Sequence, residues 1–143
     1  MTDSGIEKAK MLAEKSGTYV DFFKANILDY RLSEKFDIVF SSGVFHFIAP
    51  DLRAEIAENL KQYTNENGIH AINVFVEKPF IKRAPDPERS EENRFPWKSG
   101  ELFTLYHDWL LHKTEEVIFD CNSGGKPHKH CMDIMISEKV ELS

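Results

Sequence analysis

A histidine placed between two phenylalanines is the most distinctive candidate for chemistry in this sequence of 143 residues: His46, in the run FDIVFSSGVFHF. An imidazole titrates near neutral pH, so His46 could accept a proton or orient a bound molecule. Because Phe45 and Phe47 flank it, His46 could equally be a packed side chain held by one hydrogen bond. Both interpretations stay open on the sequence alone.

The residues before His46 predict where it lies. From Phe36 to Phe40 the chain is apolar on both faces, interrupted only by Asp37, and a polar stretch that begins at Ser41 then ends the strand. A strand of this kind is typical of the interior of a parallel sheet. Ligands of open α/β sheets gather beyond the carboxyl ends of such strands, so we expect a ligand near the loop Ser41 to Phe47.

A second group of chemically capable residues lies near the end of the chain: Cys121, His128, His130 and Cys131. Two thiolates and two imidazoles could bind zinc tetrahedrally. The spacing matches no common zinc finger or ribbon, however, and in a hairpin His128 and His130 share one face while Cys131 points to the other. We therefore expect no metal here, and interpret the group as structural or as part of a substrate-binding site.

The surrounding pattern predicts an α/β fold. An amphipathic helix is expected over Thr2 to Lys15, and a second helix begins at Pro50 and Asp51. Strands are expected at Tyr19 to Ala25, at Phe36 to Phe40 and at Ile69 to Val76. The second helix therefore connects two strands that are apolar on both faces, which indicates a crossover between parallel strands.

The last third of the chain predicts a loop, a short helix and a hairpin. Four of the six prolines lie between Glu77 and Trp97, which predicts a lid-like loop over 77–98, with plain disorder as the alternative. Ser99 can cap a short helix. Strands at Trp109 to Cys121 and at His130 to Ser137 flank a turn and predict a C-terminal antiparallel hairpin.

Composition limits the classes of function. The length suits a single domain, 1–143. A net charge of −6, with no long run of lysine or arginine, argues against nucleic acid as the main partner. No apolar run is long enough to cross a bilayer, so we expect no membrane partner and a cytoplasmic location.

Taken in order, these motifs resemble the class I methyltransferases that depend on S-adenosyl-L-methionine (SAM), and within them the tellurite-resistance methyltransferase family. FDIVFSSGVFHF, the helix after it and NGIHAINVF carry the general resemblance, and FPWKSGELFTLYHDW and GKPHKHCMDIMISEK carry the narrower one. The resemblance covers nearly the whole chain. It implies SAM as the cofactor and a small-molecule methyl acceptor, such as a tellurite-like or selenite-like oxyanion or a thiol.

One hallmark of that family has no counterpart in the sequence. These enzymes hold SAM on a glycine-rich loop after the first strand, yet none of the seven glycines here forms a G-x-G. We therefore expect a Rossmann-like class I methyltransferase sheet that lacks its first two strands, in the C-terminal portion of a truncated domain. Catalysis by this chain alone is then doubtful, and its exposed sheet edges predict self-association or binding of a partner as the alternative function. A fragment of another nucleotide-binding α/β fold is a third alternative, without a fingerprint to support it.

The resemblance also assigns site residues. His46 is the catalytic candidate, as a base or as a group that orients the acceptor. Aromatic faces attract cations, so aromatic side chains of the substrate side and lid could face the cationic sulfonium. The cofactor-binding candidates are Asn26, Ile27, Ser41, Ser42 and Val44, and the candidates for the substrate side and lid are Phe45, Phe47 and Trp97.

Overall fold

The computed structural model describes residues 2–82, 94–122 and 125–142. It divides into two compact units, Met1–Arg31 and Leu32–Ser143. The expectation of a single domain over 1–143 therefore stays a prediction. Among the described residues, no helix is both long enough and apolar enough to cross a membrane.

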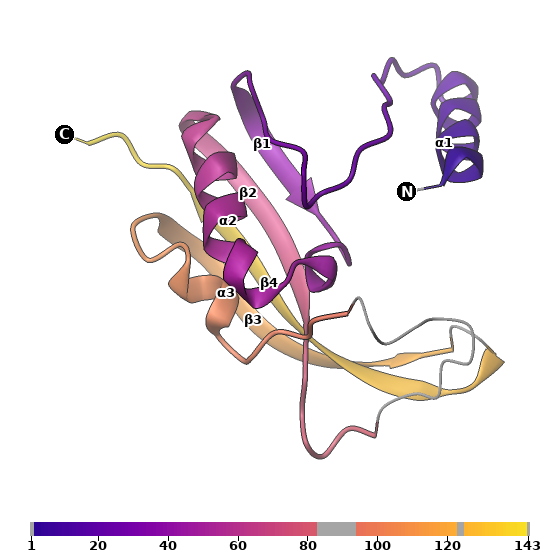
Figure 1. Ribbon diagram of the computed structural model, residues 1–143, viewed down its shortest axis with the longest axis vertical. Helices are drawn as coiled ribbons and strands as arrows, with labels where there is room; N and C mark the ends of the chain where they lie inside the picture. The colour runs from indigo at the N-terminus through magenta and orange to yellow at the C-terminus, as the bar shows by residue number, and fades with distance from the viewer. Residues whose placement is uncertain (1, 83–93, 123–124, 143) are drawn as a thin grey trace. The chain divides into compact units, whose positions relative to one another are not determined.

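The first unit contains one helix, α1 (Asp3–Lys15), which confirms the predicted N-terminal helix (Figure 1). The side chain of Thr2 caps it, because Thr2 Oγ1 accepts a hydrogen bond from the backbone N–H of Gly5 at 3.2 Å. The negative charge of Asp3 in the first turn and the positive charge of Lys15 in the last suit the helix dipole.

The predicted strand over Tyr19 to Ala25 is wrong, because this segment is irregular and forms no ladder. Its aromatic side chains are largely exposed, with Tyr19 at 92% and Phe23 at 56%. A strand forms only where a neighbouring strand accepts its backbone hydrogen bonds, and among the described residues no strand pairs with this segment. The local preference of these residues for a strand was therefore not enough to form one.

The second unit is built on a four-stranded sheet with the order β1-β2-β4-β3. Its strands are β1 (Phe36–Ser41), β2 (Thr64–Val76), β3 (Leu110–Cys121) and β4 (His128–Glu138). The strands β1 and β2 are parallel and are connected through α2 (Arg53–Gln62), while β4 is antiparallel to both β2 and β3 (Figure 1). The predicted crossover and the predicted C-terminal hairpin are both confirmed.

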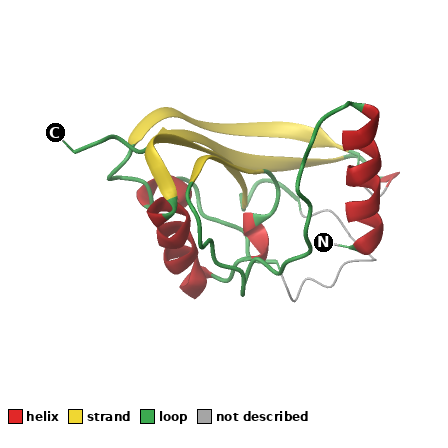
Figure 2. Cartoon of the chain, turned by 90° about the horizontal axis from the view of Figure 1, so that it is seen from above, coloured by secondary structure: helices red, strands yellow, loops and turns green. Residues whose placement is uncertain are grey.

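The sheet has one well-covered face. Alternate side chains of β2 are buried on it, from His70 to Val76, and α2 buries Ile56 and Ala57. Figure 2 shows α2 against this face of the sheet, and the short helix α3 (Glu101–Thr104) adds the fully buried side chain of Leu102. The hydrophobic core of the second unit therefore lies between β2, β4 and these helices.

Apolar residues on both faces predicted an interior strand, which is wrong for the described sheet, whereas the exposed edge expected of a sheet that lacks its first two strands agrees with the position of β1. β1 is the edge strand and pairs only with β2. Its side chains Ile38 and Phe40 are 68% and 74% exposed. They project to the face opposite α2, in register with Ile69 and Ala71 of β2. Apolar character on both faces thus correctly indicated a strand, but the sheet ends at it.

The segment after β2 returns beside the end of that strand. Trp97 donates its backbone N–H to the carbonyl of Phe75 at 2.9 Å, and Glu77 donates to the carbonyl of Trp97 at 3.1 Å. Residues 83–93 of the predicted lid, 77–98, lie outside the described residues. The N-cap of α3 is Gly100 rather than the predicted Ser99, and buried Asp133 accepts the Gly100 N–H at 2.7 Å.

Candidate functional site

The loop after β1 is held to β2 by one asparagine side chain. Asn73 Oδ1 accepts the backbone N–H of Gly43 at 3.0 Å, and Asn73 Nδ2 donates to Ser42 Oγ at 2.9 Å. Gly43 has a φ of +65°, a left-handed conformation that glycine adopts without the strain that a side chain would add. The loop is therefore fixed at the carboxyl ends of two parallel strands, where the sequence predicted a ligand.

Asn73 is a site residue that was not among the candidates predicted from the sequence. The signal was present, because Asn73 is the single amide side chain in the otherwise apolar run IHAINVFV, apart from the histidine. A polar side chain in a strand of this kind needs a hydrogen-bond partner, and here that partner is the predicted ligand loop.

Ser41 and Val44 lie on either side of this loop. Ser41 ends β1, in register with Ile72, and its Oγ is buried without a hydrogen-bond partner among the described residues. Val44 is 39% exposed and begins the short 3₁₀ helix η1 (Phe45–Phe47). A buried hydroxyl without a partner is a group that a bound molecule can satisfy.

His46 is a packed side chain next to this loop. It is 9% exposed, and its ring lies 4.2 Å from the ring of Phe47 and 5.1 Å from that of Phe75, as measured between centroids. Its backbone carbonyl accepts the N–H of Phe95 at 2.7 Å. This environment positions the imidazole firmly, which suits both of the alternatives left open by the sequence.

The three aromatic candidates of the substrate side differ in exposure. Phe45 and Trp97 are 4% and 1% exposed and stack on each other with centroids 6.3 Å apart. The guanidinium of Arg53 lies 4.1 Å above the Trp97 ring, which places a cation of the protein itself on that face. Phe47 is 40% exposed, and of the three it is the one open to a ligand.

Asn26 and Ile27 belong to the first unit, and their assignment to the cofactor stays a prediction. Asn26 forms a local turn, in which its Oδ1 accepts the N–H of Leu28 at 3.2 Å and its Nδ2 donates to Asp29 at 2.7 Å. Both polar atoms of the side chain are thus used within the turn, as is common for asparagine.

Phe75 connects His46 with a second histidine. Its ring lies 5.0 Å from the ring of His130 on β4, on the side of the sheet away from α2. His130 Nε2 lies 2.8 Å from His128 Nε2. Burial lowers the pKa of His130, and the neighbouring His128 and Arg94 lower it further. The sequence pattern indicated both histidines as candidates but gave no signal for Phe75, which lies between them.

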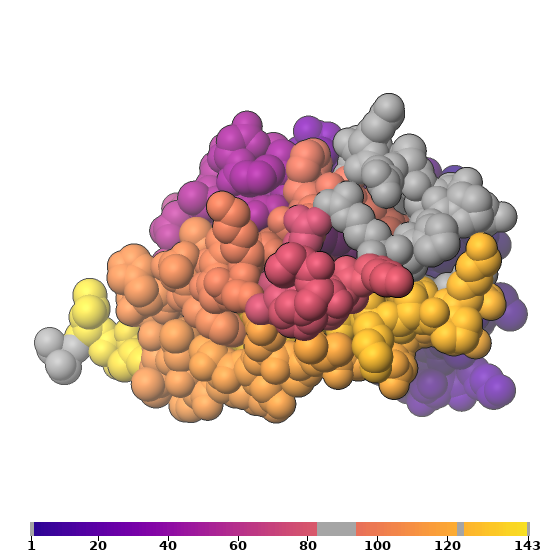
Figure 3. All heavy atoms as spheres, turned by 90° about the horizontal axis from the view of Figure 1, so that it is seen from below, coloured from indigo at the N-terminus to yellow at the C-terminus, as the bar shows by residue number. Residues whose placement is uncertain are grey.

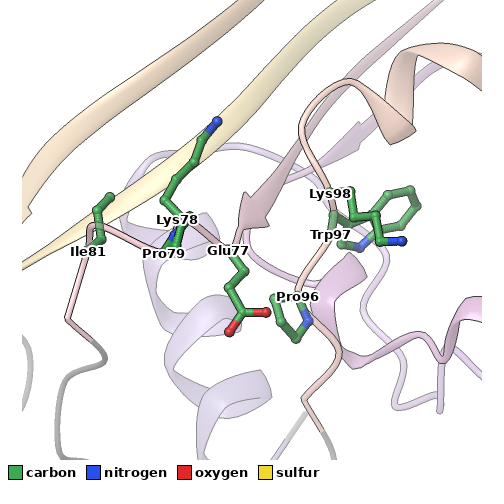
Figure 4. Close-up of a pocket in the computed structure, with 7 residues that line it drawn as sticks. All are labelled: Glu77, Lys78, Pro79, Ile81, Pro96, Trp97 and Lys98. Carbon is green, nitrogen blue, oxygen red and sulfur yellow. The ribbon is translucent and has the colours of Figure 1, made fainter.

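An open pocket of about 520 Å³ lies beyond the end of β2. The segments 77–81 and 96–98 line it, with Lys78 pointing toward the sheet and Glu77 away from it (Figure 4). Lys78 Nζ lies 2.6 Å from Glu116 Oε1, and this contact raises the pKa of Lys78 and lowers that of Glu116. Figure 3 shows segment 77–82 (pink) on the surface beside residues of the C-terminal hairpin (orange).

The strand order and the loop after β1 define the fold as that of the class I methyltransferases, and solved structures agree. The crystal structure of TehB from Haemophilus influenzae has a TM-score of 0.80 at 21% identity, over 96% of this chain and 47% of that one. A SAM-dependent methyltransferase from Methanosarcina mazei has a TM-score of 0.70 at 14% identity, over 99% of this chain and 80% of that one.

A third similar structure contains ligands. It is the Burkholderia thailandensis 1,6-didemethyltoxoflavin N1-methyltransferase with bound 1,6-didemethyltoxoflavin and S-adenosylhomocysteine. Its TM-score is 0.62 at 17% identity, over 94% of this chain and 57% of that one.

The family itself is shown by the sequence. Residues 3–127 match the family described as tellurite resistance protein TehB, and the chain belongs to this family. It spans about half the length of the Haemophilus influenzae structure. Among curated proteins, none matches the chain.

Proposed function

We propose that this chain takes part in methyl transfer from SAM to a small acceptor. The observation that carries the proposal is the loop after β1, which Asn73 holds at the carboxyl ends of β1 and β2. Membership of the TehB family and the class I methyltransferase fold support it. In such folds the ligand lies beyond the carboxyl ends of the parallel strands.

The residues present fit one side of the cofactor. Ser41 offers a buried hydroxyl without a partner among the described residues, and Val44 offers apolar surface at the start of η1. The chain has no G-x-G motif for the methionine part, so these contacts alone predict weak affinity. When bound, SAM would supply an electrophilic methyl group.

The chain's own residues would orient the acceptor and manage its proton. Methyl transfer is an in-line displacement, so the acceptor must be aligned and water excluded. Phe47, 40% exposed, would supply an apolar contact, and His46, fixed against Phe47 and Phe75, would orient the acceptor or receive its proton. For the acceptor we propose a soft chalcogen compound, an oxyanion or a thiol, because of the family.

Thermal unfolding with and without S-adenosylhomocysteine tests cofactor binding. A ligand at a hundred times its Kd adds about 2.7 kcal/mol to the free energy of unfolding, which raises the Tm of a domain of this size by several degrees. We expect a saturable rise in Tm, with NADH as the control ligand. No rise with S-adenosylhomocysteine at any concentration, together with no heat of binding in calorimetry, would contradict the proposal for this chain.

A second candidate function is association through the edge strand. Ile38 and Phe40 of β1 are largely exposed on a strand that pairs on one side only. An exposed apolar edge strand favours pairing with another chain, and we propose a second copy of this chain as the partner. Sedimentation velocity should show association that rises with concentration and is weakened in Phe40→Glu. Phe80→Glu changes a phenylalanine that is also exposed (69%) but lies in a loop, and should have no effect.

A further inference from the structure

Three possible metal ligands converge at the turn end of the C-terminal hairpin, where β3 ends and β4 begins. In the register of β3 and β4, Cys121 lies directly opposite His128, and His130 follows two residues later on the same face. One ligand atom from each of the three residues lies within 4.8 Å of the other two. All three side chains are partly buried. The hairpin register, rather than any sequence motif, thus creates the cluster.

The ring nitrogens of this cluster are suitably arranged for a cation. His128 Nδ1 lies 2.7 Å from the carbonyl oxygen of Lys126, which can only accept, so Nδ1 carries the proton and Nε2 presents its lone pair. That Nε2 lies 2.8 Å from His130 Nε2. A hydrogen bond from the ring to a backbone carbonyl is also one of the ways in which proteins orient a metal-bound histidine.

The surroundings hold His130 in place. Its ring lies 5.0 Å from Phe75 and 5.7 Å from Phe119, between centroids.

The geometry of zinc requires only a small movement of the two imidazoles. Nitrogens bound to one tetrahedral zinc ion at 2.0–2.1 Å lie about 3.3–3.4 Å apart, so the rings of His128 and His130 need to separate by only about half an ångström. The fourth cysteine or histidine named from the sequence, Cys131, projects to the other face and is 2% exposed.

We propose that Cys121, His128 and His130 form a binding site for Zn²⁺. A thiolate with two imidazoles is a donor set that suits a borderline cation and disfavours Mg²⁺ or Ca²⁺, which prefer oxygen. Three protein ligands leave a fourth position of the tetrahedron open to water or to a bound molecule. This departs from the expectation drawn from the sequence, which weighed four ligands at an unfamiliar spacing and not three on one face.

Binding of Co²⁺ and Zn²⁺ to the whole chain tests the site. Titration with Co²⁺ under a non-thiol reductant should give one equivalent per chain, with the visible bands of tetrahedral Co²⁺ and a thiolate-to-cobalt charge-transfer band in the near ultraviolet. Zn²⁺ should displace it. Cys121→Ser should abolish the charge-transfer band, and His128→Gln and His130→Gln should each weaken Zn²⁺ binding at least tenfold against a chromophoric chelator.

A histidine outside the cluster provides the matched control. His112 lies on the same hairpin, on β3, and its Nε2 contacts Glu138 at its other end. His112→Gln should therefore bind Zn²⁺ as the unchanged chain does, and circular dichroism shows whether each variant is folded. The proposal is overturned if the chain binds no Zn²⁺, if the cobalt spectrum lacks a thiolate band, or if His112→Gln weakens binding as much as His128→Gln. None of these readouts depends on SAM or on methyl transfer.

Discussion

Tyr106 donates its phenolic O–H to His70 Nδ1, at 2.9 Å, inside the core of the second unit. The direction follows from the other side of the ring. Thr64 Oγ1 donates to the carbonyl of Leu60 at 2.7 Å, so it accepts the proton of His70 Nε2 at 2.8 Å, and Nδ1 is left as an acceptor. The hydrogen bonds that join Tyr106, His70 and Thr64 can therefore all form only while the imidazole is neutral.

Stability should fall in mildly acidic solution because of His70. Burial, together with the positive charges of Lys61 and Lys139, lowers its pKa from 6.5 to about 4. Below pH 6.5 the unfolded chain binds a proton that the native chain does not bind until about pH 4. The free energy of unfolding therefore decreases as the pH falls through this range, by about 3 kcal/mol in total at 1.36 kcal/mol per pKa unit.

Urea unfolding over this pH range measures the effect. Other acidic and basic groups also titrate, so the informative quantity is the difference between the unchanged chain and His70→Gln. The variant should be less stable at neutral pH but should lose less stability between about pH 6.5 and pH 4. Equal pH dependence in both proteins would contradict the assignment of a neutral His70.

Tyr106→Phe should destabilise the chain by leaving His70 Nδ1 without a donor. Tyr106 is 0% exposed, so water cannot replace its hydroxyl. A buried acceptor that loses its partner costs about 1–3 kcal/mol. Tyr19→Phe is the control, because Tyr19 is 92% exposed and its change should cost less than about 0.5 kcal/mol. Similar unfolding midpoints in urea for the two variants would speak against the hydrogen bond.

Arg53→Ala should lower the free energy of unfolding, because Arg53 holds the segment after residue 93 to the second unit's core. Its Nη1 donates to Glu101 at 2.6 Å and its Nη2 to the carbonyl of Phe95 at 2.7 Å, while its side chain is 4% exposed. Arg53→Ala removes the donor to Glu101 Oε1 and to the carbonyl of Phe95. Because Glu101 is partly solvated, we expect a loss of about 2–4 kcal/mol rather than the full cost of a buried ion pair.

The exposed ion pair of Lys113 and Glu115 provides a comparison for Arg53. Their N–O distance is 2.8 Å, and each side chain is nearly half exposed. Lys113→Ala should cost less than about 1 kcal/mol, because water and salt screen such a pair. Chemical unfolding of both variants decides the matter, and equal losses would mean that the burial of Arg53 contributes nothing.

The sequence predicted those parts of the fold that depend on neighbouring residues in the chain, and failed for those that depend on distant ones. The period of apolar residues gave α1, α2 and the four strands of the sheet, because each pattern fixes its own element. Tyr19 to Ala25 failed because a strand also needs a neighbour, which no local pattern reveals. The burial of β1 was wrong for the same reason.

In the candidate site, too, local signals could be predicted from the sequence and contacts between distant residues could not. Ser42 and His46 could be named because they follow a strand, which is a local signal. Asn73 and Phe75 reach them from a strand some thirty residues further along the chain. The cluster of Cys121, His128 and His130 depends on the register of a hairpin, and register is set by the pairing of whole strands.

Asn73→Ala tests whether the loop after β1 is the ligand site. Without the amide, the N–H of Gly43 and the Oγ of Ser42 lose their partner, and the loop is no longer held in one conformation. The rise in Tm on addition of S-adenosylhomocysteine should then shrink to less than half, since the ligand must first order the loop. Asn65→Ala is the matched control, because Asn65 lies on the same strand and its Nδ2 donates to Asp37 at 2.8 Å, near the other end of β1. That variant should keep the full rise in Tm, and an equal rise in the two variants would remove the loop from the proposed site.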